Sequence, residues 1–194
     1  HTIAQASGAL SELAGAAVER LSPATDDLEL LKRQLTEASE ESDLIVTSGG
    51  VSMGVYDFTK AALRALDAEF FFERVALRPG KPTVFARLPN GTLVFGLPGN
   101  PVSVSVTFNL FVRTALLAMQ GATQPALVEE WAVLARNVKG SFERESYLPA
   151  KLQTNEAGQL LAEPLQWGGS SDFVAFANAT TLIIVPPAVK QLEV

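Results

Sequence analysis

The sequence contains no cysteine and a single histidine, His1. Without cysteine the chain can form neither a disulfide bond nor a thiolate metal site. One histidine alone cannot supply the ligand sets of the common zinc sites, and it offers no serine–histidine pair for acyl transfer. These absences direct the search for function away from thiol, zinc and serine-hydrolase chemistry.

Basic residues are fewer than acidic ones, 15 against 21, which gives the 194-residue chain a formal net charge of -6. Because nucleic-acid binding requires a basic face, we expect no nucleic-acid partner. No apolar run approaches the ~18 residues of a membrane span, and no signal peptide is visible. We therefore expect a cytoplasmic protein with no membrane contact. The missing initiator Met and a start inside a helical pattern suggest a piece of a longer chain.

The stretch around which the chain is organised is residues 93–103, LVFGLPGNPVS. It predicts a short strand, a glycine-containing turn and the start of a long apolar helix over residues 102–119. Asn100 suits the N-cap of that helix, and Pro101 suits its first position. A free helix N-terminus attracts anions, and Ser103 could add a hydroxyl donor. The alternative is a tight strand-to-helix connection that binds nothing.

A second strand, glycine loop and helix follow the same logic earlier in the chain. Residues 43–47 predict a strand and residues 48–54 (SGGVSMG) a loop, after which Asp57 can cap a helix over residues 58–66. Two adjacent glycines with two serines directly after a strand are typical of phosphate sites. The motif is neither a P-loop nor the dinucleotide-binding fingerprint.

Upstream of this unit, residues 3–13 predict a helix, residues 16–21 a short strand and residues 28–39 a second helix. Thr25 or Asp26 can cap the second helix. For the acidic pair Asp26 and Asp27, helix capping is also the favoured local explanation, ahead of a role in binding.

The one dense group of basic residues, Arg74, Arg78 and Lys81, lies at a turn. Residues 69–77 predict a strand, and residues 78–82 (RPGKP) predict a turn whose backbone is fixed by two prolines. The turn lies close in sequence to the 93–103 stretch. We therefore favour an anion-binding role for these cations over an ordinary solvated turn.

Alternating strands and helices over residues 1–121 predict an α/β domain with an open, largely parallel sheet. A hairpin within it joins residues 83–88 to residues 92–95 through the turn Pro89-Asn-Gly. Ligands bind beyond the carboxyl ends of parallel strands, so the loops that follow the strands should converge on one crevice. Whether the basic turn lies at the same edge cannot be derived from spacing.

Residues 121–125 (GATQP) mark a linker, and residues 126–194 predict a small β-rich domain. The elements expected in this domain are strands over residues 131–138, 147–154, 160–165 and 181–185, and a short helix over residues 173–177. The polar loop 168–172 (GGSSD) that precedes the helix is most simply an ordinary connection.

Three of these stretches, 47–57 (TSGGVSMGVYD), 78–82 (RPGKP) and 96–103 (GLPGNPVS), resemble in order and spacing the molybdopterin molybdenumtransferase (MoeA) family. That family is related to the E domain of gephyrin and its plant counterpart. The resemblance covers the whole chain. It implies an open three-layer α/β/α molybdopterin-binding domain that lacks its first strand, followed by a small β-barrel domain.

The resemblance also implies an activity. Members of the family insert molybdate into adenylylated molybdopterin and release AMP, with the help of a divalent cation, usually magnesium (Mg²⁺). It further implies a homodimer for the full-length protein, in which upstream domains contribute to the active site, and contact with the adenylyltransferase of the pathway. On this reading the chain alone carries only part of an active site.

Residue by residue, the family motifs imply catalytic roles for Asp26, Asp57, Arg74, Arg78 and Lys81. The two aspartates would hold the divalent cation or organise the pterin phosphate. The two arginines stand where lysine is common, and with Lys81 they would face molybdate or phosphate oxygens. The residues expected to bind substrate are Ser48, Gly49, Gly50, Ser52, Gly54, Pro98, Gly99, Asn100, Pro101, Ser103, Arg144 and Ser170, the last of which would close the site.

Some positions depart from the family pattern. Val55 stands where many relatives carry an acidic residue. Arg144 matches the first of two hairpin arginines, whereas the second falls near Pro149. Three alternatives stay open: a related adenylyltransferase, a non-catalytic pterin-binding scaffold, and an unrelated sugar-phosphate enzyme. The β-rich residues 121–194 argue against the adenylyltransferase, and ATP consumption would favour it.

Overall fold

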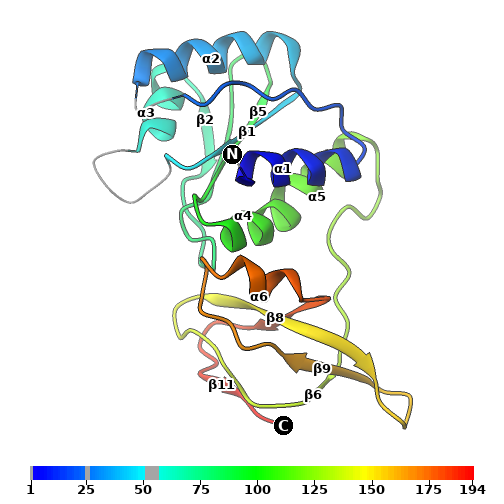
Figure 1. Cartoon of the computed structure of the whole chain (residues 1–194). Helices are drawn as coiled ribbons and strands as arrows, with labels where there is room; N and C mark the ends of the chain where they lie inside the picture. Colours follow the sequence, from blue (N-terminus) through cyan, green and yellow to red (C-terminus); the bar gives the residue numbers. More distant parts are fainter. Residues whose placement is uncertain (1, 25–26, 51–56) are drawn as a thin grey trace.

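The chain is divided into two parts (Figure 1). In the upper part, helices cover a sheet. The lower part is built mainly of strands and contains the short strand at residues 77–78 and the elements from residue 133 onward. The structure is a computed structural model that describes residues 2–24, 27–50 and 57–194. The mixed α/β class expected from the sequence is confirmed.

The sheet of the upper part has the order β1-β5-β4-β2, with β1 at Leu44–Ser48, β5 at Leu93–Leu97, β4 at Val84–Arg87 and β2 at Glu69–Phe72. Among the described strands of this sheet, only β1 and β5 run parallel, and the pairs β5–β4 and β4–β2 are antiparallel. The expectation of a largely parallel sheet is therefore wrong. The reason is local, because the predicted hairpin turn brings β4 back against β5, with the Gly91 amide donating to the Leu88 carbonyl at 2.9 Å.

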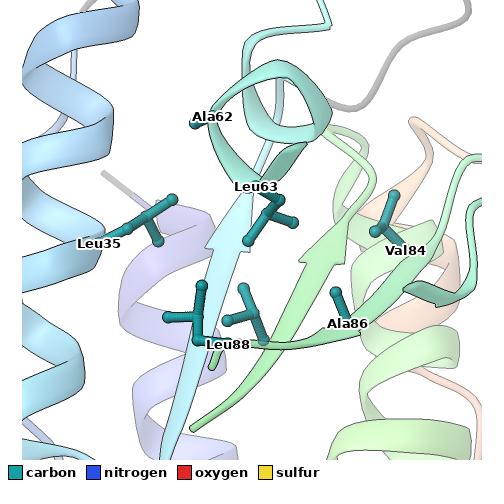
Figure 2. Close-up of a cluster of buried hydrophobic side chains, with 7 residues drawn as sticks. Leu35, Ala62, Leu63, Val84, Ala86 and Leu88 are labelled. Carbon is teal, nitrogen blue, oxygen red and sulfur yellow. The ribbon is translucent and has the colours of Figure 1, made fainter. Parts of the chain in front are cut away.

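Helices cover both faces of this sheet, and the alternation of side chains along each strand explains why. Val94 of β5 points into a cluster with Leu35 of α2 (Leu28–Glu41) and Leu63 of α3 (Phe58–Ala65). Figure 2 shows this cluster. The next residue, Phe95, points to the opposite face, into a cluster with α1 (Thr2–Leu13) and the apolar helix after β5. The result is the three-layer arrangement that the resemblance implied.

The apolar helix runs as α4 (Pro101–Thr107), a π-helical turn η1 (Phe108–Val112) and α5 (Arg113–Met119). Within the described residues, Pro101–Met119 is long and apolar enough to cross a membrane by length and composition, with mean hydropathy 1.6. This corrects the expectation that no apolar run approaches that length. One such helix is weak support for a membrane span, because core helices pass the same test. Here Phe108 and Val112 pack under the sheet, whereas Val106 packs against the lower part.

The lower part contains a sheet of order β10-β8-β9-β6, with the short strand β3 paired to β8, and a small β11–β7 sheet. Strands β8 and β9 are joined by a tight turn over residues 155–158, between the two strands that the sequence predicted. The elements of this part are β3 (Leu77–Arg78), β6 (Val133–Leu134), β7 (Val138–Lys139), β8 (Glu145–Thr154), β9 (Leu160–Pro164), α6 (Phe173–Ala177), β10 (Thr181–Val185) and β11 (Gln191–Leu192).

Several local predictions differ from the structure. The predicted strand at 131–138 is split into β6 and β7, and β11 was not foreseen. The predicted strand at 69–77 ends at Phe72, after which the chain crosses to pair with β8. Residues 16–21 form no strand and lie on the surface, with Leu21 51% exposed, because a segment that buries so little has no packing reason to join the sheet.

The cap of α2 is also different from the prediction. Asp27 caps the helix, with its Oδ1 accepting hydrogen bonds from the Glu29 amide at 3.0 Å and the Leu30 amide at 3.1 Å. Thr25 and Asp26, the predicted caps, lie outside the described residues. Of the acidic pair Asp26 and Asp27, the described residue Asp27 therefore acts as the helix cap.

A shared apolar cluster fastens the two parts together. It contains Leu77 of β3, Val102 and Val106 of α4, and Tyr147 of β8, each nearly fully buried. The Tyr147 hydroxyl donates to Glu145 Oε1 at 2.7 Å. Burial, reinforced by that carboxylate, raises the pKa of Tyr147, so the phenol stays protonated within the cluster.

Because Phe108 is 0% exposed at the centre of the upper core, Phe108→Ala should lower the free energy of unfolding by about 3–5 kcal/mol. The matched control is Phe142→Ala, which removes a ring that is 64% exposed and should change stability by less than about 0.5 kcal/mol. Denaturant unfolding followed by circular dichroism measures both. Equal losses in the two variants would contradict this packing.

Candidate anion-binding site

The described start of the glycine loop, residues 48–50, and the Gly96–Asn100 turn lie side by side at one edge of the upper sheet. Their strands, β1 and β5, are parallel, with Ser48 in register with Leu97. The Gly49 amide donates to the Leu97 carbonyl at 3.1 Å, and a side chain at Gly99 would lie 3.8 Å from the Gly49 Cα. The two loops therefore converge as the sequence predicted.

The basic turn lies at the same edge, which sequence spacing could not decide. Because β4 is antiparallel to β5, the start of β4 lies beside the end of β5, with Val84 in register with Gly96. Gly80, in the middle of the turn, has φ +119, and a Cβ there would meet Thr107 Cγ2 of α4 at 2.4 Å. The Thr83 hydroxyl donates to the Gly80 carbonyl at 2.6 Å.

The cations of this turn are available for a ligand. Arg74 and Arg78 are exposed and Lys81 is half-buried, and none of them forms an ion pair with a described residue. By contrast, Arg64 and Arg87 nearby are paired with Glu73 and Glu69. Charge at the turn is thus left uncompensated within the described part of the chain.

The lower part brings a fourth basic residue, Arg144, next to the strand β3. Leu77 and Arg78 pair with Glu145 and Ser146 of β8, and the Glu145 amide donates to the Ala76 carbonyl at 3.0 Å. The backbone of Arg144 is therefore next to the strand that carries Arg78, and Arg144 forms no ion pair with a described residue. Pro149 lies further along β8 and is buried.

The N-terminus of α4 is less free than the sequence predicted. Asn100 occupies the N-cap position, but its side chain makes no cap hydrogen bond and instead donates to Ser170 Oγ at 3.1 Å. The Ser170 carbonyl accepts from the Val102 amide at 3.3 Å. The loop 168–172 therefore takes one of the helix's free amides and ties the lower part to the turn.

Other residues of this turn differ in accessibility. Gly99 and Asn100 are exposed, Pro101 is half-buried, and Pro98 and Ser103 are buried. The expected hydroxyl donor Ser103 thus lies beneath the turn, where its carbonyl accepts from the Thr107 hydroxyl at 2.8 Å.

Asp172 holds the Ser170 loop in its conformation. Its carboxylate accepts hydrogen bonds from the Gly168 amide at 2.9 Å and from the Ala175 amide of α6 at 3.0 Å. These backbone bonds favour the ionised form, so they lower the pKa of Asp172.

Asp57 stands at the start of α3 with a partner that sequence reasoning missed. Its Oδ1 accepts from the Lys60 amide at 3.2 Å, which confirms the predicted cap, and its Oδ2 pairs with the Lys60 ammonium. The signal in the sequence was the three-residue spacing within one helical turn. Asp26, Ser52 and Gly54, with Val55, lie outside the described residues.

The described residues do not fit a divalent-cation site. No group of three or more histidine, cysteine, aspartate or glutamate residues within them could hold a metal ion. Asp57, the described member of the predicted metal pair, already uses both carboxylate oxygens. We therefore derive no step through magnesium.

Two buried hydroxyls lie where strands lead into the site. Thr47 Oγ1 of β1 and Ser146 Oγ of β8 have no hydrogen-bond partner in the described part of the chain. Thr47 is in register with Gly96, and Ser146 is in register with Arg78. The edge thus combines cations that form no ion pair with the described residues, turns that contain glycine, and hydroxyl groups. This combination suits electrostatic binding of a polyanion.

Two family models match the chain. Residues 3–118 match a probable molybdopterin binding domain, and residues 131–194 match the MoeA C-terminal region (domain IV). The boundary between the two matches falls at the segment between α5 and β6.

The chain is similar to curated proteins named molybdopterin molybdenumtransferase. That of Haemophilus influenzae is 36% identical over 149 residues, which cover 76% of this chain and 36% of the relative. That of Bacillus subtilis is 33% identical over 180 residues, 93% of this chain and 41% of the relative. The chain thus spans about two-fifths of the length of these relatives.

Solved structures are also similar to this chain. A molybdopterin biosynthesis MoeA protein from Pyrococcus horikoshii superposes with a TM-score of 0.67 at 31% identity, over 87% of this chain and 39% of that chain. A molybdenum cofactor biosynthesis protein from Pyrococcus furiosus has a TM-score of 0.74 at 23% identity, over 99% and 61%. The second likeness bears on the fold alone.

Gly80→Ala should lower the free energy of unfolding by more than about 1 kcal/mol, because its φ disfavours a side chain and its Cβ meets Thr107. Thr107→Ser removes the opposing methyl and keeps the hydroxyl. The double variant should therefore recover the steric part of the loss but not the backbone part. Thermal unfolding of the four proteins in this cycle tests the packing, and a double variant no better than the sum of the singles contradicts it.

Asp172→Asn should reduce stability in a pH-dependent way. Because the pKa of Asp172 is lowered on folding, its stabilisation is complete above the unfolded-chain value of about 3.9 and is lost as pH falls through the folded value. The difference in unfolding free energy between wild type and variant should be largest near neutral pH and shrink in acid. A difference that grows toward acid would contradict the assignment.

Proposed function

The chain belongs to the MoeA family, and from that membership we propose that it acts in molybdenum cofactor biosynthesis as part of a molybdopterin molybdenumtransferase. The proposed reaction is insertion of molybdate into adenylylated molybdopterin with release of AMP. Because the chain spans about two-fifths of its curated relatives, the activity proposed is that of the complete gene product.

One observation supports this proposal: the basic turn before β4, the Gly96–Asn100 turn and Gly49 lie at one edge of the upper sheet. Arg78 supplies charge from the basic turn and Arg144 from the adjoining start of β8, while Ser170 reaches the turn at Asn100. Molybdate and the phosphates of adenylylated molybdopterin are anions. A cationic edge with glycine-containing turns is a favourable environment for such groups.

We assign the residues as follows. Arg74, Arg78 and Lys81, with Arg144, hold the oxygens of molybdate and phosphate, and the planar arginine fork favours paired contacts with two oxygens. Glycine at positions 49, 50 and 99 lets the backbone approach the ligand. At Gly49 a side chain would meet no described residue within 4 Å. Ser48 and Ser170 supply hydroxyls at the rim, and Pro98, Asn100, Pro101 and Ser103 shape the turn.

The alternatives are less well supported. A pterin adenylyltransferase would not explain the match of residues 131–194 to the MoeA C-terminal region, and the curated relatives are named transferases of molybdenum, not scaffolds. A homodimer, contact with the pathway's adenylyltransferase and a cytoplasmic location complete the proposal on the strength of the resemblance.

The test is AMP release from adenylylated molybdopterin, with and without molybdate, by the complete gene product. Arg78→Ala should lower the molybdate-dependent rate on the order of 100-fold, because it removes a charged donor to the anion. The matched control is Arg33→Ala, an exposed arginine on α2 paired weakly with Glu37, which should leave the rate unchanged. Molybdate-dependent release that survives Arg78→Ala would refute the assigned site. Absence of release in the wild type would refute the activity.

A further inference from the structure

We propose that the Lys60 ammonium is the built-in counter-cation of Asp57, standing where a divalent cation would otherwise bind, and that it acts as a positioning residue for the anion site. The inference deepens the proposed function and rests on it for the identity of the anion. Its test measures cation and anion binding directly, so it can fail or succeed separately from the AMP-release assay.

The geometry of the pair gives each carboxylate oxygen of Asp57 a partner. Lys60 approaches both oxygens of Asp57, its backbone amide at Oδ1, 3.2 Å away, and its ammonium at Oδ2. Both side chains are only 17% exposed, so water screens the pair less than it screens a surface ion pair. A metal ion at Asp57 would have to compete with the ammonium of the residue that the same carboxylate caps.

The pair is fastened to the glycine loop. Thr59, between the two partners, is 2% exposed. Its amide donates to the Gly50 carbonyl at 3.3 Å, and its hydroxyl lies 3.5 Å from the Gly49 carbonyl. Asp57 and Lys60 are therefore held at the same sheet edge as the proposed anion site.

The charge balance explains why a lysine is useful there. An unpaired carboxylate beside the glycine loop would repel phosphate and molybdate, and it would attract divalent cations. Lys60 neutralises that carboxylate, whereas Arg74, Arg78 and Lys81 keep their charge free of ion pairs with the described residues. The edge thus retains a net positive charge although it contains an aspartate.

The experiment compares wild type with Lys60→Met. Mn²⁺ binding is measured by the loss of the free-ion signal in electron paramagnetic resonance, and inorganic pyrophosphate binding by calorimetry. Lys60→Met leaves the Asp57 carboxylate uncompensated, so it should bind Mn²⁺ more tightly than the wild type and pyrophosphate about tenfold more weakly. Lys60→Arg should return both affinities toward those of the wild type, and Asp57→Asn/Lys60→Met should remove the gain in Mn²⁺ affinity.

The matched control is Lys32→Met. Lys32 and Glu29 form an ion pair with the same three-residue spacing near the start of α2, with Nζ–Oε1 at 3.0 Å. It should change neither binding property. A wild type that binds one Mn²⁺ through Asp57, with no change in Lys60→Met, would overturn the proposal. Loss of pyrophosphate binding in Lys60→Met that arginine does not restore would also overturn it. If Lys60→Met does not fold, Asp57→Asn alone must strengthen pyrophosphate binding, and failure to do so refutes the inference.

Discussion

The antiparallel register of β4 on β5 is the constraint on which the site depends. It places Val84 beside Gly96, so the basic turn before β4 lies next to the turn after β5. A parallel arrangement would have carried the cations to the opposite edge. The parallel pair β1–β5 then brings the glycine loop to the same place. One hairpin and one parallel pair therefore bring together three segments that are separate in the sequence.

The lower part of the chain shares elements and core with the upper one. The strand β3 leaves the upper part to pair with β8, and Leu77, Val106 and Tyr147 form a common apolar cluster. Because this contact is buried, Ser170 and the start of β8 reach the site on packed elements, so their positions are set by burial and not by a linker. The apolar helix formed by α4, η1 and α5 contributes side chains to the cores of both parts. This explains why its sequence is apolar over nearly its whole length.

Local signals predicted what is locally determined. The hairpin turn, the Asp57 cap, α6 and β10 follow from turn chemistry, capping and short apolar runs, and all are present. The predictions of a largely parallel sheet and of a strand at residues 16–21 were wrong. Strand pairing depends on partners far along the chain, which local patterns do not reveal. The Asn100–Ser170 bond, across 70 residues, had no local signal. The three-residue spacing of Asp57 and Lys60 within one helical turn is a local signal for their ion pair. From the sequence, Asp57 was assigned to a metal ion, and Lys60 was not predicted as its partner.

A chain with a net charge of -6 can still present an anion site, because the sign of the local field depends on which charges are paired. Arg64, Arg87 and Arg136 are each matched by a glutamate, so their fields are largely cancelled nearby. Asp57 at the glycine loop is cancelled in turn by Lys60. What remains at this edge is the charge of the basic turn, next to the Gly96–Asn100 turn and the start of the glycine loop. Pairing elsewhere thus concentrates positive potential where the strands end, and the site needs no overall basic composition.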